Sequence, residues 1–334
     1  MAFDNIKLEK GLYGTARGFT GSLEMLDPSE NYKGTPLEGL DAYQRQLKRF
    51  DIKISGRNSD TVEKFFKTTD SSALFPEYVA RAVATGMEEA GRLDSIVASI
   101  SDINGLDYRS ITSIPSEEDK LLADVAEGAF IPTTTVKTKD KLVSLKKRGR
   151  MLVASYEAIR FQRLDLFTVM LRQIGAYIAR AQFCDAVDVL INGDGNDNAA
   201  EVLNCSTPSN LSYADLVSLW NSFSPYNMNV LLASPALMPS LLNMEEFKDA
   251  AAGQSFHGTG RMISPLGAEL IKTSALEGSR LIGLDKSCAL EKVTAGSVVT
   301  EYDKLIDRQL ERAAVTVTAG FAKIFDDSAK VLNV

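Results

Sequence analysis

The sequence is poor in the residues on which most metal and catalytic sites depend. Its 334 residues contain one histidine, His257, and three cysteines, Cys184, Cys205 and Cys288, which lie far apart without a CxxC pair. Structural zinc sites usually draw on several cysteine and histidine ligands, so we expect neither a zinc site nor another cofactor. This cysteine usage also fits a reducing compartment.

Long hydrophobic runs are also missing. No stretch of about 18 apolar residues could span a membrane, and the opening MAFDNIKLEKGLYG lacks the apolar region of a secretory signal. Lys plus Arg number 37 and Asp plus Glu 44, which gives a net charge of −7. An acidic chain argues against nucleic-acid binding through overall charge, although local basic patches remain possible. We expect a soluble intracellular protein.

What the sequence does contain is a mixture of helical and strand patterns. Apolar spacing predicts helices over 40–52, 72–91 and 165–192 and strands over 229–235, 279–285 and 313–325. The last of these helices would be roughly 40 Å long. The irregular order of helices and strands favours an α+β fold over a doubly wound α/β sheet.

The helix expected over 72–91 has a narrow apolar stripe of Val79, Ala82, Val83 and Met87. A narrow stripe is typical of a helix that packs on a neighbouring subunit and builds no core of its own. Residues 1–68 precede it and are rich in glycine and polar residues up to Gly39. We expect this leader to be ordered in the assembled protein.

Residues 108–150 form a long segment with strand-like ends and few core-forming residues. Its first half carries the acids Glu117, Glu118, Asp119, Asp124 and Glu127, and its second half carries the cations Lys137, Lys139, Lys141, Lys146, Lys147, Arg148 and Arg150. A hairpin of this length is not stable alone and needs another surface. We therefore interpret Glu117–Asp119 and the cations from Lys137 to Arg148 as inter-subunit contacts. A solvated hairpin and direct contact with phosphates are the alternatives.

Two stretches resemble chemical sites. In LINGDGNDNAAEVLN (190–204), a calcium loop starting at Asp194 would need glycine where Ala199 stands and glutamate where Cys205 stands. A phosphate loop fails because its glycines would have to precede a helix. We therefore expect Gly193 to end the helix in the left-handed conformation.

The second stretch is GQSFHGTGRM (253–262), which holds the only histidine together with a serine and an arginine. It lacks the GxSxG pattern and an evident orienting carboxylate. We interpret it as a surface loop.

Together these segments resemble the major capsid proteins of tailed bacteriophages, from about Thr69 to the end of the chain. TTDSSALFPEYVARAV is similar to that family's N-terminal arm, and ADVAEGAFIPTTTVKTKDKLVSL to its extended loop with the EGAFIP turn. The long helix ending in LINGDGN resembles the spine helix. ERAAVTVTAGFAKIFDDSAKVL resembles the returning peripheral strand.

The resemblance implies a domain plan. It comprises an N-terminal extension (1–68), an N-terminal arm (69–107), an extended loop (108–150), a peripheral domain with the spine helix (151–213), an axial domain (214–308) and a peripheral return strand (309–334). Gln254, His257 and Arg261 would then lie in a loop at the capsomer axis.

The resemblance also implies a role as a structural protein and not an enzyme. Copies would form the hexamers and pentamers of an icosahedral shell around double-stranded phage DNA. Scaffolding, portal and decoration proteins are implied partners, with non-specific contact to DNA and none to a membrane. The implied location is the virion, after assembly in the host cytoplasm.

Some members of the family crosslink through a lysine just before the proline of the extended loop. Ile131 stands at that position here, and 300–312, where the partner would lie, contains no asparagine. We therefore predict no autocatalytic crosslink. The main alternative is an encapsulin, a cellular nanocompartment with the same fold that encloses enzymes. An α+β enzyme and a nucleic-acid-binding module are less well supported, because the chain has few titratable groups suited to catalysis and is acidic overall.

Overall fold

The computed structural model describes residues 2–15, 17–113, 124–129, 131, 133, 136–155, 157, 161–248, 264 and 266–334. It divides the chain into two compact units. Unit 1 contains Met1–Ala90, Arg148–Ala179 and Ser297–Val317, and unit 2 contains Gly91–Lys147, Arg180–Gly296 and Thr318–Val334. Helices and strands occur in both units, as an α+β fold requires.

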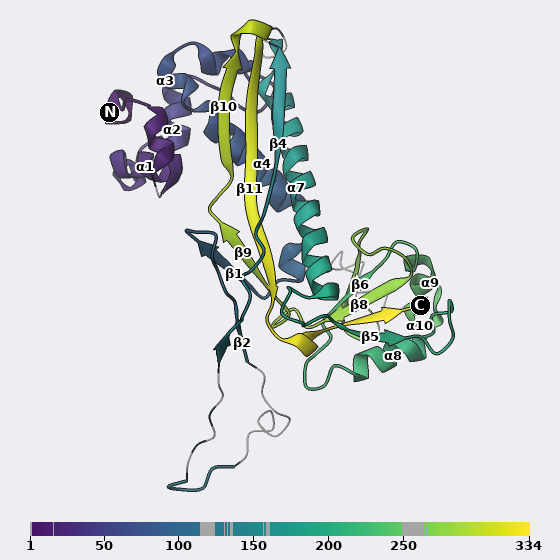
Figure 1. The fold of residues 1–334 in the computed structure, drawn as a ribbon. Helices are drawn as coiled ribbons and strands as arrows, with labels where there is room; N and C mark the ends of the chain where they lie inside the picture. The colour runs from purple at the N-terminus through teal and green to yellow at the C-terminus, as the bar shows by residue number, and fades with distance from the viewer. Residues whose placement is uncertain are drawn as a thin grey trace. The chain divides into compact units, whose positions relative to one another are not determined.

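Unit 1 combines helices with long antiparallel strands (Figure 1). Its helices are α1 (Gly18–Leu26), α2 (Ala42–Arg49), α3 (Thr69–Ser72), α4 (Phe75–Ala90) and the first part of α7 (Leu164–Asn192). Strand β11 (Leu310–Lys323) pairs with both β10 (Val299–Leu305) and β4 (Lys146–Ser155). The predicted long helix over 165–192 is confirmed as α7.

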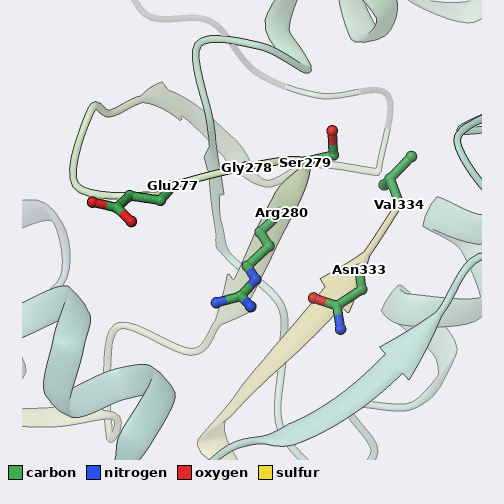
Figure 2. Close-up of a pocket in the computed structure, with 6 residues that line it drawn as sticks. All are labelled: Glu277, Gly278, Ser279, Arg280, Asn333 and Val334. Atoms are coloured by element: carbon green, nitrogen blue, oxygen red, sulfur yellow. The ribbon is translucent and has the colours of Figure 1, made fainter.

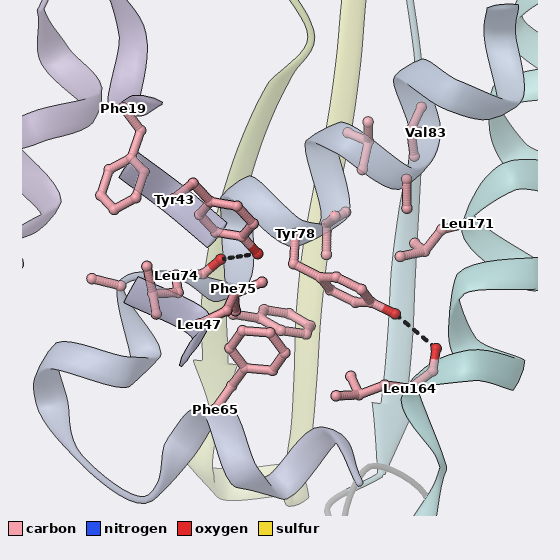
Figure 3. Packing of buried hydrophobic residues seen from close by; sticks show 14 of the residues in the cluster. Phe19, Tyr43, Leu47, Phe65, Leu74, Phe75, Tyr78, Val83, Leu164 and Leu171 are labelled. Carbon is pink, nitrogen blue, oxygen red and sulfur yellow. Dashed lines mark hydrogen bonds between the residues drawn. The ribbon is translucent and has the colours of Figure 1, made fainter. Parts of the chain in front are cut away.

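The core of unit 1 lies between this sheet and its helices (Figure 3). Phe65, Phe75 and Tyr78 pack against one another in edge-to-face and tilted arrangements, with ring centroids 5.4 to 6.1 Å apart. The buried Tyr78 hydroxyl donates a 2.9 Å hydrogen bond to the Leu164 carbonyl at the start of α7. Burial of this ring raises the pKa of Tyr78 to about 12. The aromatic side chains of this core thus link α4 to α7.

Helix α4 does not behave as the narrow apolar stripe suggested. Val79 and Val83 are fully buried in the core of their own unit, so the expectation of a helix that buries little within its own subunit is wrong. Glycines let the two helices approach closely, because a Cβ on Gly175 would overlap the Val83 carbonyl and one on Gly86 would overlap the backbone of Arg172. The sequence alone could not show this crossing, because Gly86 and Gly175 are far apart along the chain.

The leader before α3 is folded onto unit 1, and we call residues 2–66 the N-terminal module. Phe19, Leu23 and Tyr43 of this module belong to the same core as α4. Helices α1 and α2 are joined by a 2.7 Å ion pair between Asp27 and Arg45, whose side chains are both fully buried. The module is therefore an integral part of the core of unit 1.

Unit 2 is built on a five-stranded mixed sheet in the order β5-β12-β8-β6-β7. Its strands are β5 (Glu201–Asn204), β6 (Val230–Ala233), β7 (Glu269–Lys272), β8 (Arg280–Leu284) and β12 (Ala329–Asn333), and its helices include α8 (Tyr213–Asn221), α9 (Met238–Asn243) and α10 (Glu245–Lys248). Every residue of β6 is buried, as its continuous apolar run predicts.

Each face of this sheet covers a separate apolar cluster. Val230 and Leu232 of β6 face the second half of α7, whereas Leu231 and Ala233 pack with residues of α8 and α9. Strand β12 divides its residues in the same way, with Val331 in the first cluster and Leu332 in the second. Two-sided burial fixes the register of both strands, because a shift by one residue would exchange the two faces.

The last strands of the chain lie in two different sheets, and the domain plan implied by the resemblance stays a prediction. Strand β12 pairs with β8 and β5, so it lies in the sheet of unit 2, and β10, which was expected within the axial range, pairs with β11 in unit 1. Strand β11 is long enough to contribute residues to both units. Strands β1 (Ser99–Ile103) and β9 (Leu290–Ala295) pair in parallel. Strand β9 also pairs antiparallel with the last residues of β11.

Candidate assembly surfaces

A two-stranded ribbon begins the extended segment. Strands β2 (Ile111–Thr112) and β3 (Lys137–Thr138) are antiparallel, and the Lys139 amide donates a 2.9 Å hydrogen bond to the Ser110 carbonyl. Residues 113–136 lie between them, and from here on the name extended loop is kept for this narrower part of the range 108–150. The hairpin-like ends predicted for this segment are confirmed, whereas Lys146, Lys147 and Arg148 belong to strand β4 and not to the loop.

The described part of the extended loop is exposed to solvent. Residues 124–129 are all exposed, with a turn at Gly128 at φ +77°. Val125, Ile131 and Val136 are 45%, 70% and 62% exposed. These three apolar side chains are therefore in contact with solvent on their own subunit.

The predicted cations differ in their surroundings. Lys137, Lys141 and Lys147 are exposed. Lys139 is instead buried, with its ammonium 2.8 Å from the Asp194 carboxylate, so it is not available for contact with a neighbour. The Lys146 ammonium lies 2.9 Å from Asp185 of α7 within the same subunit, although its side chain stays half exposed.

Several predicted site residues lie outside the described part of the chain. Glu117, Glu118 and Asp119 of the acidic half, and Gln254, His257 and Arg261 of the expected axial loop, are among them. Their assignment to inter-subunit and capsomer-axis contacts stays a prediction. Arg148 is described and half-buried on β4.

The segment after α7 ends that helix as predicted. Gly193 has φ +81°, and its amide donates a 2.9 Å hydrogen bond to the Val189 carbonyl. The sequence did not indicate a further role for this loop. We call residues 108–112 and 137–143 the root of the extended loop. Asp194 accepts hydrogen bonds from Lys139 of this root and from the Lys323 amide at the end of β11.

Burial alone would raise the pKa of Asp194. The Lys139 ammonium and the Asn196 amide outweigh that effect and hold the pKa below its usual range. Asp194 is therefore ionised at neutral pH.

One face of the unit 1 sheet is available for contact. Val315 and Val317 of β11 point into the core, so the alternate residues point to the opposite face. On β4, Leu152 packs on the core, whereas Met151 and Val153 are 56% and 55% exposed. We call this surface the open sheet face; it comprises Met151, Val153, Val299, Glu301, Ala314 and Thr316.

A hollow lies at the ends of β8 and β12 (Figure 2). It is lined by Glu277, Gly278, Ser279, Arg280, Asn333 and Val334. These residues are exposed or half-buried and include no histidine or cysteine. Across the described residues, no three His, Cys, Asp or Glu side chains are grouped so that they could hold a metal ion. None of the described helices is both long and apolar enough to cross a membrane.

Comparison with solved structures shows the fold of shell-forming proteins. A virus-like particle from Pyrococcus furiosus matches with a TM-score of 0.53 at 12% identity, over 77% of this chain and 98% of that one. The capsid of a native GTA particle matches with a TM-score of 0.55 at 12% identity, over 73% and 90%. The capsid of an empty GTA particle gives a TM-score of 0.52 at 13% identity, over 73% and 89%.

The sequence itself gives the family. The phage capsid protein family model matches residues 138–322, more than half of the chain, so the chain belongs to that family. No curated protein matches this chain. The resemblance derived from the arm, extended loop and spine helix is therefore confirmed at the level of family and fold.

Proposed function

We propose that this chain is the major capsid protein of a tailed bacteriophage, forming the hexamers and pentamers of a shell around double-stranded DNA. The single observation that supports this best is the extended loop, whose Val125, Ile131 and Val136 are exposed on their own subunit. Burying them against another copy would remove apolar surface from water. The role is structural and not enzymatic, and the virion, assembled in the host cytoplasm, is the expected location.

The open sheet face is the surface we propose for the loop of a neighbouring copy. Each arm of the extended loop has about 12 residues and could span roughly 40 Å when extended. Met151, Val153 and Val299 supply apolar contact area on the sheet face. Glu301 of the same face would attract the exposed Lys137 in the loop root of the neighbouring copy. A loop of one copy on the face of the next is a heterologous contact, which gives a ring when the rotation between successive copies closes.

We further propose that the shell is held without covalent crosslinks. Ile131, which precedes the loop proline, is 70% exposed and offers no amine to a neighbour. Non-covalent contacts, or a decoration protein, would then stabilise the shell. Denaturing electrophoresis of purified particles tests this, because a ladder of covalent multimers that survives reduction and boiling would contradict it.

The test of the whole proposal is assembly of the full chain expressed alone. We expect hollow particles, or capsomers that close when scaffolding and portal proteins are supplied, in negative-stain electron microscopy. Val153→Asp on the open sheet face should abolish assembly and leave the subunit folded, whereas Met25→Asp on α1, 63% exposed, serves as the matched control. A small oligomer that never assembles under any of these conditions would contradict the proposal.

A shell enclosing protein cargo, as in encapsulins, is the second candidate. The structural similarity to the Pyrococcus furiosus virus-like particle favours a shell without deciding its contents. Particles purified from the native source separate the two candidates. Double-stranded DNA protected from nuclease supports the phage capsid, and a co-purifying enzyme with no nucleic acid supports the compartment.

A further inference from the structure

The first segment of the root, residues 108–112, is attached to a buried carboxylate. Glu291 of β9 is 6% exposed, and the Tyr108 hydroxyl donates a 2.6 Å hydrogen bond to its Oε1. Ser110 donates to its Oε2, and Ser101 of β1 donates to Oε1 at 2.5 Å. Three hydroxyl groups from two neighbouring segments therefore converge on one side chain, and two of them belong to the loop root.

The second segment of the root, residues 137–143, is attached through a buried ion pair. The Lys139 ammonium donates to Asp194 Oδ2 at 2.8 Å and also to the Lys323 carbonyl. The side chains of Lys139 and Asp194 are only 4% and 3% exposed. Asp194 is held in turn by the Lys323 amide at 3.1 Å and by the Asn196 side-chain amide at 2.9 Å.

The two attachments lie next to each other on paired strands. Glu291 is opposite Ala322 in the β9–β11 ladder, and Leu290 is opposite Lys323. Backbone bonds join the two strands of the root, from the Lys139 amide to Ser110 at 2.9 Å and from the Val143 amide to Tyr108 at 2.8 Å. We call Tyr108, Ser110, Lys139, Asp194 and Glu291 the root clasp.

We infer that the root clasp sets the direction of the extended loop on its own subunit, so that every copy presents the loop to its neighbour in the same way. A buried charge is tolerated only while its partners remain in place. Swinging the root would take two of the three hydroxyl donors from the buried Glu291 and the ammonium partner from the buried Asp194. The root therefore keeps one direction relative to strands β9 and β11. The five residues are positioning residues, and the part of the inference that concerns the neighbour rests on the proposed shell function.

Two sets of variants test the clasp at its separate anchors. Tyr108→Phe combined with Ser110→Ala removes two hydroxyl donors to Glu291, and Asp194→Asn removes the charge that pairs with Lys139. Lys286→Met, which changes an exposed lysine away from the root, is the control. Amide hydrogen exchange is measured on the unassembled full-length chain, and particle diameters are measured by electron microscopy.

We expect exchange in peptides 108–112 and 137–143 to become at least about tenfold faster in both clasp variants, with exchange in the buried part of α7 unchanged. A role limited to general stability would instead accelerate exchange throughout the subunit. Shells of the clasp variants should be incomplete or of mixed diameter. The Lys286→Met control should match the wild type in both measurements.

Two outcomes would overturn the inference. One is wild-type exchange at the root in both clasp variants, and the other is a loosened root that still gives shells of uniform wild-type diameter. If Asp194→Asn does not fold, as judged by circular dichroism, the Tyr108→Phe/Ser110→Ala variant decides. If the wild type forms no shell with any added protein, the proposed function fails, while the exchange comparison still decides whether the clasp holds the root.

Discussion

The ammonium of Lys323 lies 3.1 Å from the backbone carbonyl of Asn198, and the lysine side chain is fully buried. Burial disfavours the charged form, and the nearby Lys139 ammonium acts in the same direction. Asp326, Asp327 and Asp194 oppose these effects only in part, so the pKa of Lys323 falls from 10.5 to about 8. A charged lysine at this point therefore lowers the stability of the fold near neutral pH.

The first prediction is that the unassembled chain becomes more stable as the pH rises from about 8 to about 10.5. In that window the unfolded chain keeps the Lys323 proton and the folded chain has lost it, so the unfolded state binds more protons and unfolding becomes less favourable. The shift corresponds to at most about 3 kcal/mol in the free energy of unfolding. Urea denaturation at a series of pH values measures it.

Lys323→Met should remove this rise, because the titrating group is gone. Lys286→Met changes an exposed lysine of unit 2 and should keep it. The difference between the two variants isolates Lys323 from other lysines and tyrosines that titrate in the same range. Equal slopes in both variants would show that Lys323 has an ordinary pKa in the fold.

Local sequence patterns predicted the helices and strands, but they did not predict the long-range contacts between them. The period of apolar residues gave α7, and the continuous run around Leu231 gave a buried strand, because both signals are complete within one segment. Lys139 looked like a surface cation, since its partner Asp194 is distant in the sequence and the acid's own loop looked only like a helix end. The N-terminal module was expected to be ordered, but its glycines and polar residues did not indicate that Phe19 and Leu23 enter the core.

The second prediction concerns that module. Leu23 of α1 is fully buried in the unit 1 core, whereas Leu26, three residues further along the same helix, is 57% exposed. Leu23→Ala should lower the free energy of unfolding by about 2–5 kcal/mol, through lost burial and the cavity left behind. Leu26→Ala should change it by less than about 0.5 kcal/mol. Denaturant titration compares them, and equal small effects would mean that the module does not support the core.

The third prediction concerns the crossing of α4 and α7. In an exposed helix, replacing glycine by alanine stabilises by about 1 kcal/mol. At Gly175 we expect the opposite sign, a loss of about 1–3 kcal/mol, because the added methyl group would overlap the Val83 carbonyl. Gln173→Ala, at an exposed position of the same helix, is the control and should be near neutral. A more stable Gly175→Ala variant would show that the helices can separate without cost.

The fourth prediction concerns the exposed cations near the extended loop. Lys147 of β4 is the cleanest position to test, because its neighbour Lys146 already contacts Asp185 in its own subunit, so changing Lys146 would alter an internal contact as well. Lys147→Glu should weaken assembly by replacing attraction to a neighbour's acidic residues with repulsion. One exposed contact contributes about 0.2–1 kcal/mol, but a closed shell repeats it in every copy, so the effect on assembly is multiplied.

Lys286→Glu makes the same charge change on a different surface and is the control for net charge. Light scattering during assembly at low and at high salt distinguishes the two variants. We expect Lys147→Glu to assemble less than Lys286→Glu at low salt and the difference to shrink at high salt, because ions screen exposed charges. Equal assembly of the two variants at every salt concentration would mean that Lys147 faces solvent in the shell. The contact between neighbouring copies would then depend on the apolar residues of the extended loop and of the open sheet face.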